Sequence, residues 1–268
     1  MRDNSALNNV KSKSVYLLSL VKRNQMLKII KYINLALFTV MIVMNYLANA
    51  LPLNNVTTGE LSDSYPNLFV PAGITFSIWG IIYLLLFVFC IIQFTSPNQM
   101  VISGITWLFA ITCILNSLWI VAWHFRQLPL SLLLMVLLLV VLAVINIRIK
   151  VLPAGLIKAT FGIYLGWICI ATIANVTALL VSYGWHGFGI SEINWTLIMI
   201  IAGALVAALS VYFLNNPFIG FSVIWAFAGI AMKRQEDHRS IFVTAIIALI
   251  AIAVITGWGF IRKYSAQG

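Results

Sequence analysis

Long apolar segments separated by short polar ones run through almost the whole chain. Between Thr75 and Phe125, for example, no residue is charged. Apolar segments of about 20 residues predict helices that cross a membrane. The predicted spans are 33–50, 74–94, 102–123, 130–147, 159–182, 195–214, 217–232 and 241–261. The predicted fold class is therefore all-α, a polytopic membrane helical bundle.

The seventh segment, 217–232, is shorter than the others and follows Asn215-Asn216-Pro217. It is either a complete span or a re-entrant helix that returns to the side on which it began. A complete span gives eight crossings and places both termini on one side of the membrane. The distribution of Lys and Arg favours the complete span, with the loop at 51–72 on the opposite side.

The first 32 residues form a basic tail with an apolar patch at 15–21. Such a tail either lies on the membrane surface as an amphipathic segment or is disordered. The first span ends in Ala48-Asn49-Ala50, which resembles the cleavage site of a signal peptide. The basic region before it is unusually long for that class, and this favours an uncleaved first span.

Composition supports a membrane protein and excludes several other classes. Hydrophobic residues make up 62% of the 268 positions and charged residues only 8%, against roughly 25% charged residues in soluble domains. The net charge of +10 comes from loops and chain ends, which indicates membrane topology and not nucleic-acid binding. We expect a multi-pass protein of the plasma or inner membrane, in contact with lipid, with both termini cytoplasmic.

Charged and reactive side chains are scarce where chemistry would need them. No predicted span contains Asp, Glu, Lys or Arg, which disfavours an ion-coupled transporter. The three cysteines lack metal-ligand spacing and are expected to be buried apolar side chains. His124 could ligate a haem iron, but a lone His at a membrane boundary is more often interfacial. We expect no enzyme activity, no cofactor and no metal.

Two helical stripes combine indoles with amides. Asn116, Trp119 and Trp123 share one face of the third span. Trp167 and Asn175 share one face of the fifth, with the small Ala171 between them. Amides in a membrane either bond between helices or orient a ligand in an apolar pocket, and both alternatives remain open. In the fifth span a GxxxG pair, Gly162 and Gly166, indicates close helix contact more than a homodimer.

Three segments carry a resemblance to a known family. They are FVPAGITFSIWGIIY at 69–83, LNSLWIVAWHFRQLP at 115–129 and YLGWICIATIANV at 164–176. In sequence, order and separation they resemble the signature segments of the TspO/MBR family, the tryptophan-rich sensory and translocator proteins. The resemblance implies a five-helix core over 33–185. Residues 186–268 resemble the additional helices of a longer branch of the family.

The resemblance also implies a function and a site. It implies a non-enzymatic receptor or carrier whose pocket binds tetrapyrroles, sterols or other apolar molecules beneath the loop after the first helix. The alternatives are a transporter that uses all eight helices, or a porphyrin-degrading enzyme, which Ile74 disfavours because the family usually has Trp there. The candidate site residues are Phe76, Trp79, Tyr83, Asn116, Trp119, Trp123, Tyr164, Trp167, Ala171 and Asn175.

Overall fold

The computed structural model describes residues 3–50, 53–97 and 99–265. Over these residues the chain forms helices and no strands, so the predicted all-α membrane bundle is confirmed. The α-helices are α1 (Asp3–Ala50), α2 (Thr58–Asp63), α3 (Ile78–Thr95), α4 (Gln99–His124), α5 (Leu128–Arg148), α6 (Leu156–Ser182), α7 (Glu192–Leu214), α8 (Phe218–Arg234) and α9 (Arg239–Ser265). Among them, seven are long and apolar enough to cross a membrane.

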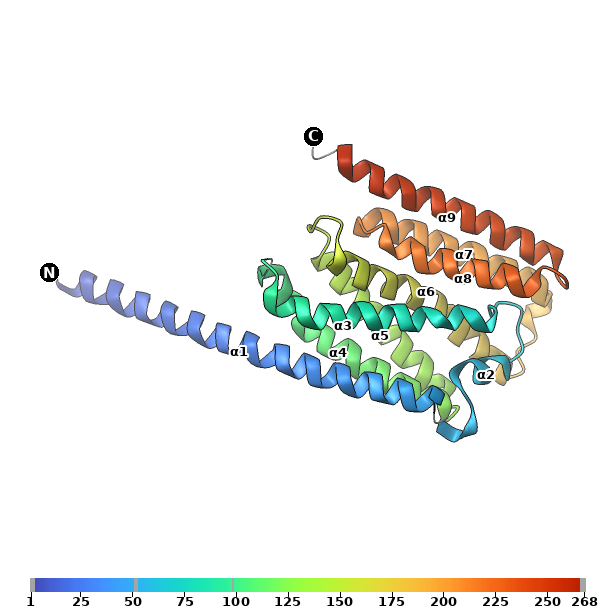
Figure 1. Ribbon diagram of the computed structural model, residues 1–268, viewed down its shortest axis with the longest axis horizontal. Coiled ribbons are helices and arrows are strands. Elements are labelled where there is room, and N and C mark those ends of the chain that lie inside the picture. The colour runs from blue at the N-terminus through green and yellow to red at the C-terminus, as the bar shows by residue number, and fades with distance from the viewer. Residues whose placement is uncertain (1–2, 51–52, 98, 266–268) are drawn as a thin grey trace.

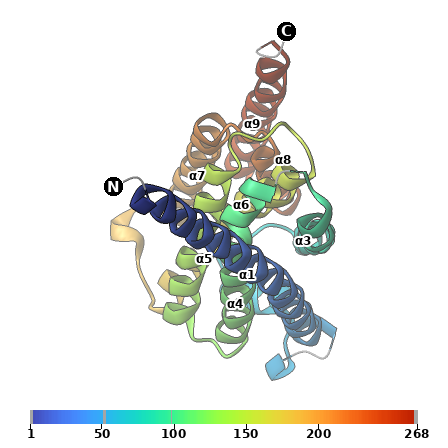
Figure 2. The same cartoon turned by 90° about the vertical axis from the view of Figure 1, so that its left-hand side faces the viewer.

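The long helices lie side by side and run in alternating directions (Figure 1). α4 packs between α1 and α5, α6 packs against α5, α3 and α8, and α9 packs against α7 and α8. α6 therefore joins the first five spans to the C-terminal helices. α1 and α9 lie on opposite sides of the bundle (Figure 2).

The first helix differs from its predicted bounds. α1 runs without a break from Asp3 to Ala50 and extends well beyond the bundle (Figure 1). The basic tail is therefore a helical continuation of the first span. It is neither a disordered segment nor a separate helix that turns onto the membrane surface.

α8 has only 17 residues, which corresponds to about 26 Å of helix, yet it crosses the whole bundle. At its start Asn216 bonds to Asn146, where α5 ends. At its end Arg234 bonds to Asn67 and Leu68, which lie near the opposite end of the bundle. The seventh predicted segment thus passes from one end to the other, and a re-entrant helix is not what the structure shows.

The glycines of the GxxxG pair are used inside the molecule. A Cβ at Gly166 would overlap the carbonyl oxygen of Ile219 and the hydroxyl of Ser222, both on α8. A Cβ at Gly162 would lie 2.7 Å from the amide nitrogen of Asn216. The pair therefore allows α8 to approach α6 closely, as the close-contact interpretation predicted.

Lys158 lies inside a helix, whereas the sequence placed it just before the fifth span. α6 begins at Leu156 and not at 159, so Lys158 lies in its first turn and is fully buried. Its Nζ donates to the carbonyl oxygens of Lys150 and Asn215, both at 2.9 Å. The ammonium group thus satisfies two carbonyl groups where helices end.

The two ends of the bundle carry different charge. Among the described residues, the end at which α1 begins and α9 ends (Figure 1) includes 11 of the 15 Lys and Arg residues but only one of the six acidic residues. We call this the terminal end, and the opposite end, which holds α2, the lid end. Lys and Arg accumulate on the cytoplasmic side of membrane proteins, so this division extends the topology prediction.

Candidate functional site

Trp79, in the first turn of α3, lies at the centre of an aromatic cluster. Its ring stacks on Tyr83 at 5.5 Å between centroids and on Trp119 at 5.7 Å, with interplanar angles of 21° and 28°. Trp167 and Tyr164 meet it edge-on, each at 6.1 Å. Rings from α3, α4 and α6 thus meet in the offset and edge-to-face arrangements that aromatic pairs prefer.

Two further aromatic residues extend the cluster. Trp123 stacks on Trp119 at 6.3 Å with an interplanar angle of 22°. Phe76 precedes α3 in a 3-10 turn, Gly73–Ser77, and meets Trp167 edge-on at 6.0 Å. The structure therefore brings together all seven aromatic residues that the sequence singled out.

Asn116 is fully buried and bonds within the bundle. Its amide nitrogen donates to the Tyr164 hydroxyl at 3.0 Å, and its oxygen accepts from Asn45 at 2.8 Å. These bonds join α1, α4 and α6, and leave the amide oxygen and nitrogen each with a partner. Asn116 thus has the helix-packing role that was one of its two alternatives. Asn45 had no sequence signal, because the tertiary structure alone pairs it with α4.

Asn175 also bonds to other helices. Its oxygen accepts from the Ser131 hydroxyl at 2.7 Å and from the Trp119 indole at 3.5 Å. Its nitrogen donates to the carbonyl of Ala171 at 3.0 Å. Asn175 therefore fixes the orientation of Trp119 and lies beside the cavity described next.

A cavity of about 40 Å³ lies beside this cluster. Its lining residues are Thr58, Ser62, Pro71, Phe76, Trp79, Trp119, Trp123, Trp167, Ile170, Ala171, Ala174 and Asn175. A neighbouring cavity of about 120 Å³ shares Thr58, Phe76 and Trp79 with it. Both are well below the roughly 300 Å³ of a typical ligand pocket, so the site has little free space.

Two buried polar atoms at the cavity have no hydrogen-bond partner among the described residues. They are the indole nitrogen of Trp167 and the hydroxyl oxygen of Thr58. A buried polar group without a partner costs about 1–3 kcal/mol. A ligand that offered an acceptor to the indole N–H would remove part of this cost.

The segment at 57–72, here called the lid, covers the cavity. It contains α2, whose N-terminus is closed by a capping box between Thr57 and Glu60. Thr58 and Ser62 of α2 and Pro71 line the cavity. The Trp123 indole donates to the Thr58 carbonyl at 3.4 Å, which joins the lid to the cluster below it.

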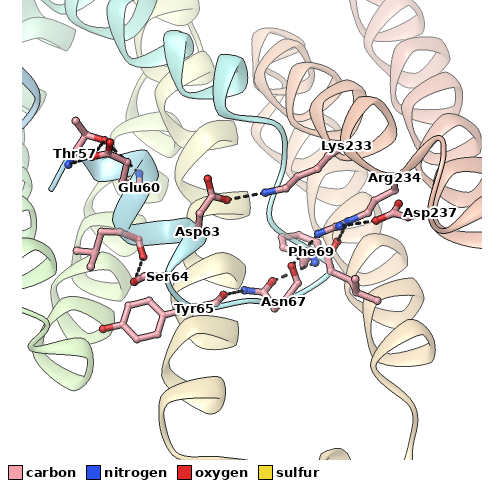
Figure 3. A network of polar contacts seen from close by, with 12 residues as sticks. Thr57, Glu60, Asp63, Ser64, Tyr65, Asn67, Phe69, Lys233, Arg234 and Asp237 are labelled. Carbon is pink, nitrogen blue, oxygen red and sulfur yellow. Dashed lines mark hydrogen bonds and ion pairs between the residues drawn. The ribbon is translucent and has the colours of Figure 1, made fainter.

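The C-terminal helices hold the lid from the side (Figure 3). Arg234 of α8 donates from its guanidinium to the carbonyls of Asn67 and Leu68, each at 3.1 Å. Lys233 pairs with Asp63 at 2.7 Å. The sequence gave no sign of these contacts, because they join residues more than 160 positions apart.

The end of the lid is attached to α8 by backbone as well. The amide of Ala72 donates to the carbonyl of Gly229 at 3.0 Å, and the Trp225 indole donates to the Thr75 carbonyl at 2.8 Å. A Cβ at Gly229 would overlap the Thr75 side chain. Glycine is therefore required where the lid meets α8.

His124 is the last residue of α4, at the end of a predicted span, as the sequence indicated. It is fully buried at the end of α4, and its Nδ1 lies 2.8 Å from the carbonyl oxygen of Ile120. That nitrogen must carry the proton to donate to a carbonyl. No group of three or more potential metal ligands occurs among the described residues.

Comparison with known proteins gives one match. A family model described as "TSPO-like protein" matches residues 31–258. No curated protein and no solved structure matches the chain. The matched range extends past the five-helix core and includes α7, α8 and most of α9.

Proposed function

The chain belongs to the TSPO-like protein family, and from this we propose that it is a non-enzymatic membrane receptor or carrier for a flat apolar ligand. The ligand binds among α3, α4 and α6, in contact with the indoles of Trp79, Trp119 and Trp167. The observation that carries this proposal is the cavity enclosed by stacked and edge-on indoles beneath the lid. A tetrapyrrole is one ligand of the required shape.

The unpaired groups at the cavity suggest the ligand's polar chemistry. Trp167 can only donate a hydrogen bond, whereas the Thr58 hydroxyl can donate or accept. The matching ligand is apolar over its faces and carries an acceptor, such as a carbonyl or carboxylate oxygen, at one edge.

Binding requires the lid to move. The cavity of about 40 Å³ holds little more than one or two water molecules, so a ring-sized ligand fits only when the lining widens, and residues 57–72 are the part of the lining outside the long helices. The lid is held by hydrogen bonds, by one exposed ion pair and by the buried side chains of Leu61 and Phe69. Opening it therefore breaks polar contacts with α8 and exposes apolar surface.

Transport through all eight helices is the second candidate, and one observation bears on it. α8 crosses the whole bundle and its end contacts the lid, so the C-terminal helices reach the site's entrance without lining the cavity. Flux of ligand in proteoliposomes separates a carrier that moves ligand across the membrane from a receptor that only binds it.

Ala171→Leu tests the proposed site. The added apolar atoms enter the cavity and separate the ligand from about two aromatic rings, each worth about 0.5–1.5 kcal/mol. The dissociation constant for protoporphyrin IX, measured by tryptophan-fluorescence quenching, should rise by roughly 5- to 150-fold. The matched control is Ala253→Leu, an exposed position on α9.

The controls decide between outcomes. If both variants bind protoporphyrin IX as tightly as the parent, the ligand does not occupy this cavity. If both weaken binding equally while their unfolding temperatures fall together, the effect is one of stability. Weaker binding by the Ala171 variant alone, at an unchanged unfolding temperature, supports the site.

A further inference from the structure

A mostly apolar hollow at the lid end lies outside the site described above, next to a more polar hollow of equal volume that Glu192, Lys233 and Arg234 border. A cavity of about 390 Å³ is bounded by the end of α6, the start of α7 and lid residues 66–69. This volume falls in the range of roughly 300–1,000 Å³ that small-molecule pockets occupy. Its apolar wall includes Leu68, Leu180, Val181 and Met199. It shares no lining residue with the cavity beneath the lid.

Two tryptophans on this wall are fixed by local contacts. Trp185 and Trp195 lie 5.1 Å apart between ring centroids, at 57°. The Trp195 indole donates to the carbonyl of Gly187 at 2.8 Å. Gly187 has φ +68°, and a Cβ there would lie 3.0 Å from that indole nitrogen. The loop between α6 and α7 thus needs glycine where it meets the ring, and it holds both indoles at the cavity.

The same wall carries one carboxylate without a cationic partner. Glu192, in the first turn of α7, accepts a hydrogen bond from the Leu68 amide at 3.0 Å. No ion pair involves it among the described residues, since Lys233 pairs with Asp63 and Arg234 with Asp237. His186 is the other titratable residue of the lining, and neither Lys nor Arg belongs to it.

We propose that this cavity is a second binding site, for an organic cation with an apolar body. The ammonium group lies between the indoles of Trp185 and Trp195 and the carboxylate of Glu192, and the apolar body contacts Leu180 and Met199. Indole faces attract ammonium groups, and aromatic cages for quaternary ammonium are built in this way. The carboxylate supplies the opposite charge. The proposal does not rest on the function proposed for the cavity beneath the lid, although residues 66–69 of the lid border this second cavity.

The test compares two ligands of one shape and different charge. Phenyltrimethylammonium and its neutral isostere tert-butylbenzene are titrated into the purified, detergent-solubilised full-length protein by calorimetry. We expect saturable binding of the cation and at least about fivefold weaker binding of the neutral molecule, the loss that one exposed cation–π contact of about 1 kcal/mol predicts.

Variants at Glu192 separate charge from shape. Glu192→Gln should weaken binding of the cation about 1.5- to fivefold, the range for an exposed ion pair, and leave binding of the neutral molecule unchanged. Glu192→Asp, which keeps the charge, should keep the preference for the cation. Trp185→Leu should weaken binding of the cation roughly two- to tenfold. Glu236→Gln, an exposed carboxylate at the same end of the bundle, is the control and should have no effect.

Several results would overturn the proposal. They are the absence of saturable binding of the cation by the parent protein, equal affinity for cation and isostere, and an unchanged affinity in Glu192→Gln. An equal loss in Glu236→Gln would also overturn it, because general surface charge and not this cavity would then attract the cation.

Discussion

Arg234 should hold the lid closed, and replacing it with Met tests this. Met keeps an apolar stem of similar reach but removes every guanidinium donor. In the parent, the Arg234 side chain is only 11% exposed and its guanidinium donates to two lid carbonyls. The exposed pair between Lys233 and Asp63 also joins α8 to the lid, with side chains 28% and 57% exposed.

The Arg234 hydrogen bonds should stabilise the closed lid more than the ion pair between Lys233 and Asp63 does. A hydrogen bond from a charged donor contributes about 1.5–3 kcal/mol, and water replaces part of that when the carbonyls are released. We therefore expect the closed lid to lose about 1–3 kcal/mol in Arg234→Met, which raises the open population roughly 5- to 150-fold. An exposed ion pair contributes about 0–1 kcal/mol, so Lys233→Met should raise the open population of the lid less than about fivefold.

Hydrogen exchange of lid amides measures this population. The amides of Leu68 and Ala72 are suitable reporters, because they donate to Glu192 and to the Gly229 carbonyl in the closed lid. Their exchange rates should rise with the open population, while amides inside α4 stay unchanged and show that the bundle is intact. Equal exchange in Arg234→Met and the parent, or a larger rise in Lys233→Met, would refute this account of the lid.

Three further predictions concern packing, topology and pH. Gly166→Ala should destabilise the protein by about 1–3 kcal/mol in thermal unfolding, because the added Cβ overlaps the α8 backbone. Gly80→Ala is the control and should not destabilise the protein, because the space around Gly80 is open. Cysteine at the exposed Ser64 should react with an impermeant reagent in intact cells, whereas cysteine at Lys150 should react only after lysis; the reverse pattern would invert the topology. Thr57, the N-cap residue of α2, donates hydrogen bonds to the Glu60 carboxylate from its backbone N–H and from its hydroxyl. These bonds, of which the backbone one has the larger effect, hold the pKa of Glu60 below its usual value. The stabilisation they provide is complete above pH 4.5 and is lost as pH falls through the lowered pKa. The protection factors of α2 amides, which remove the intrinsic pH dependence of exchange, should therefore fall there in the parent and stay constant in Glu60→Gln.

The apolar pattern alone determined the class of fold. Segments of about 20 uncharged residues have few stable forms in a bilayer other than helices, and for this reason most predicted spans agree with the observed helices. The stripes at Trp119 and Trp167 were also predictable, because helical periodicity places residues three, four or seven apart on one face. Whether these residues bind a ligand remains a prediction.

Tertiary structure decided what periodicity cannot encode. The partners of Asn116 lie on other helices, and Lys158 bonds to a carbonyl at the end of another helix. The periodicity of one helix does not show which residues of other helices it contacts. The contact of Arg234 with the lid joins positions 166 and 167 residues apart, so no local pattern predicts it. Cavity volume depends on how side chains from several helices pack together, and only the folded chain shows that the space beneath the lid is small while the larger cavity lies beside Glu192.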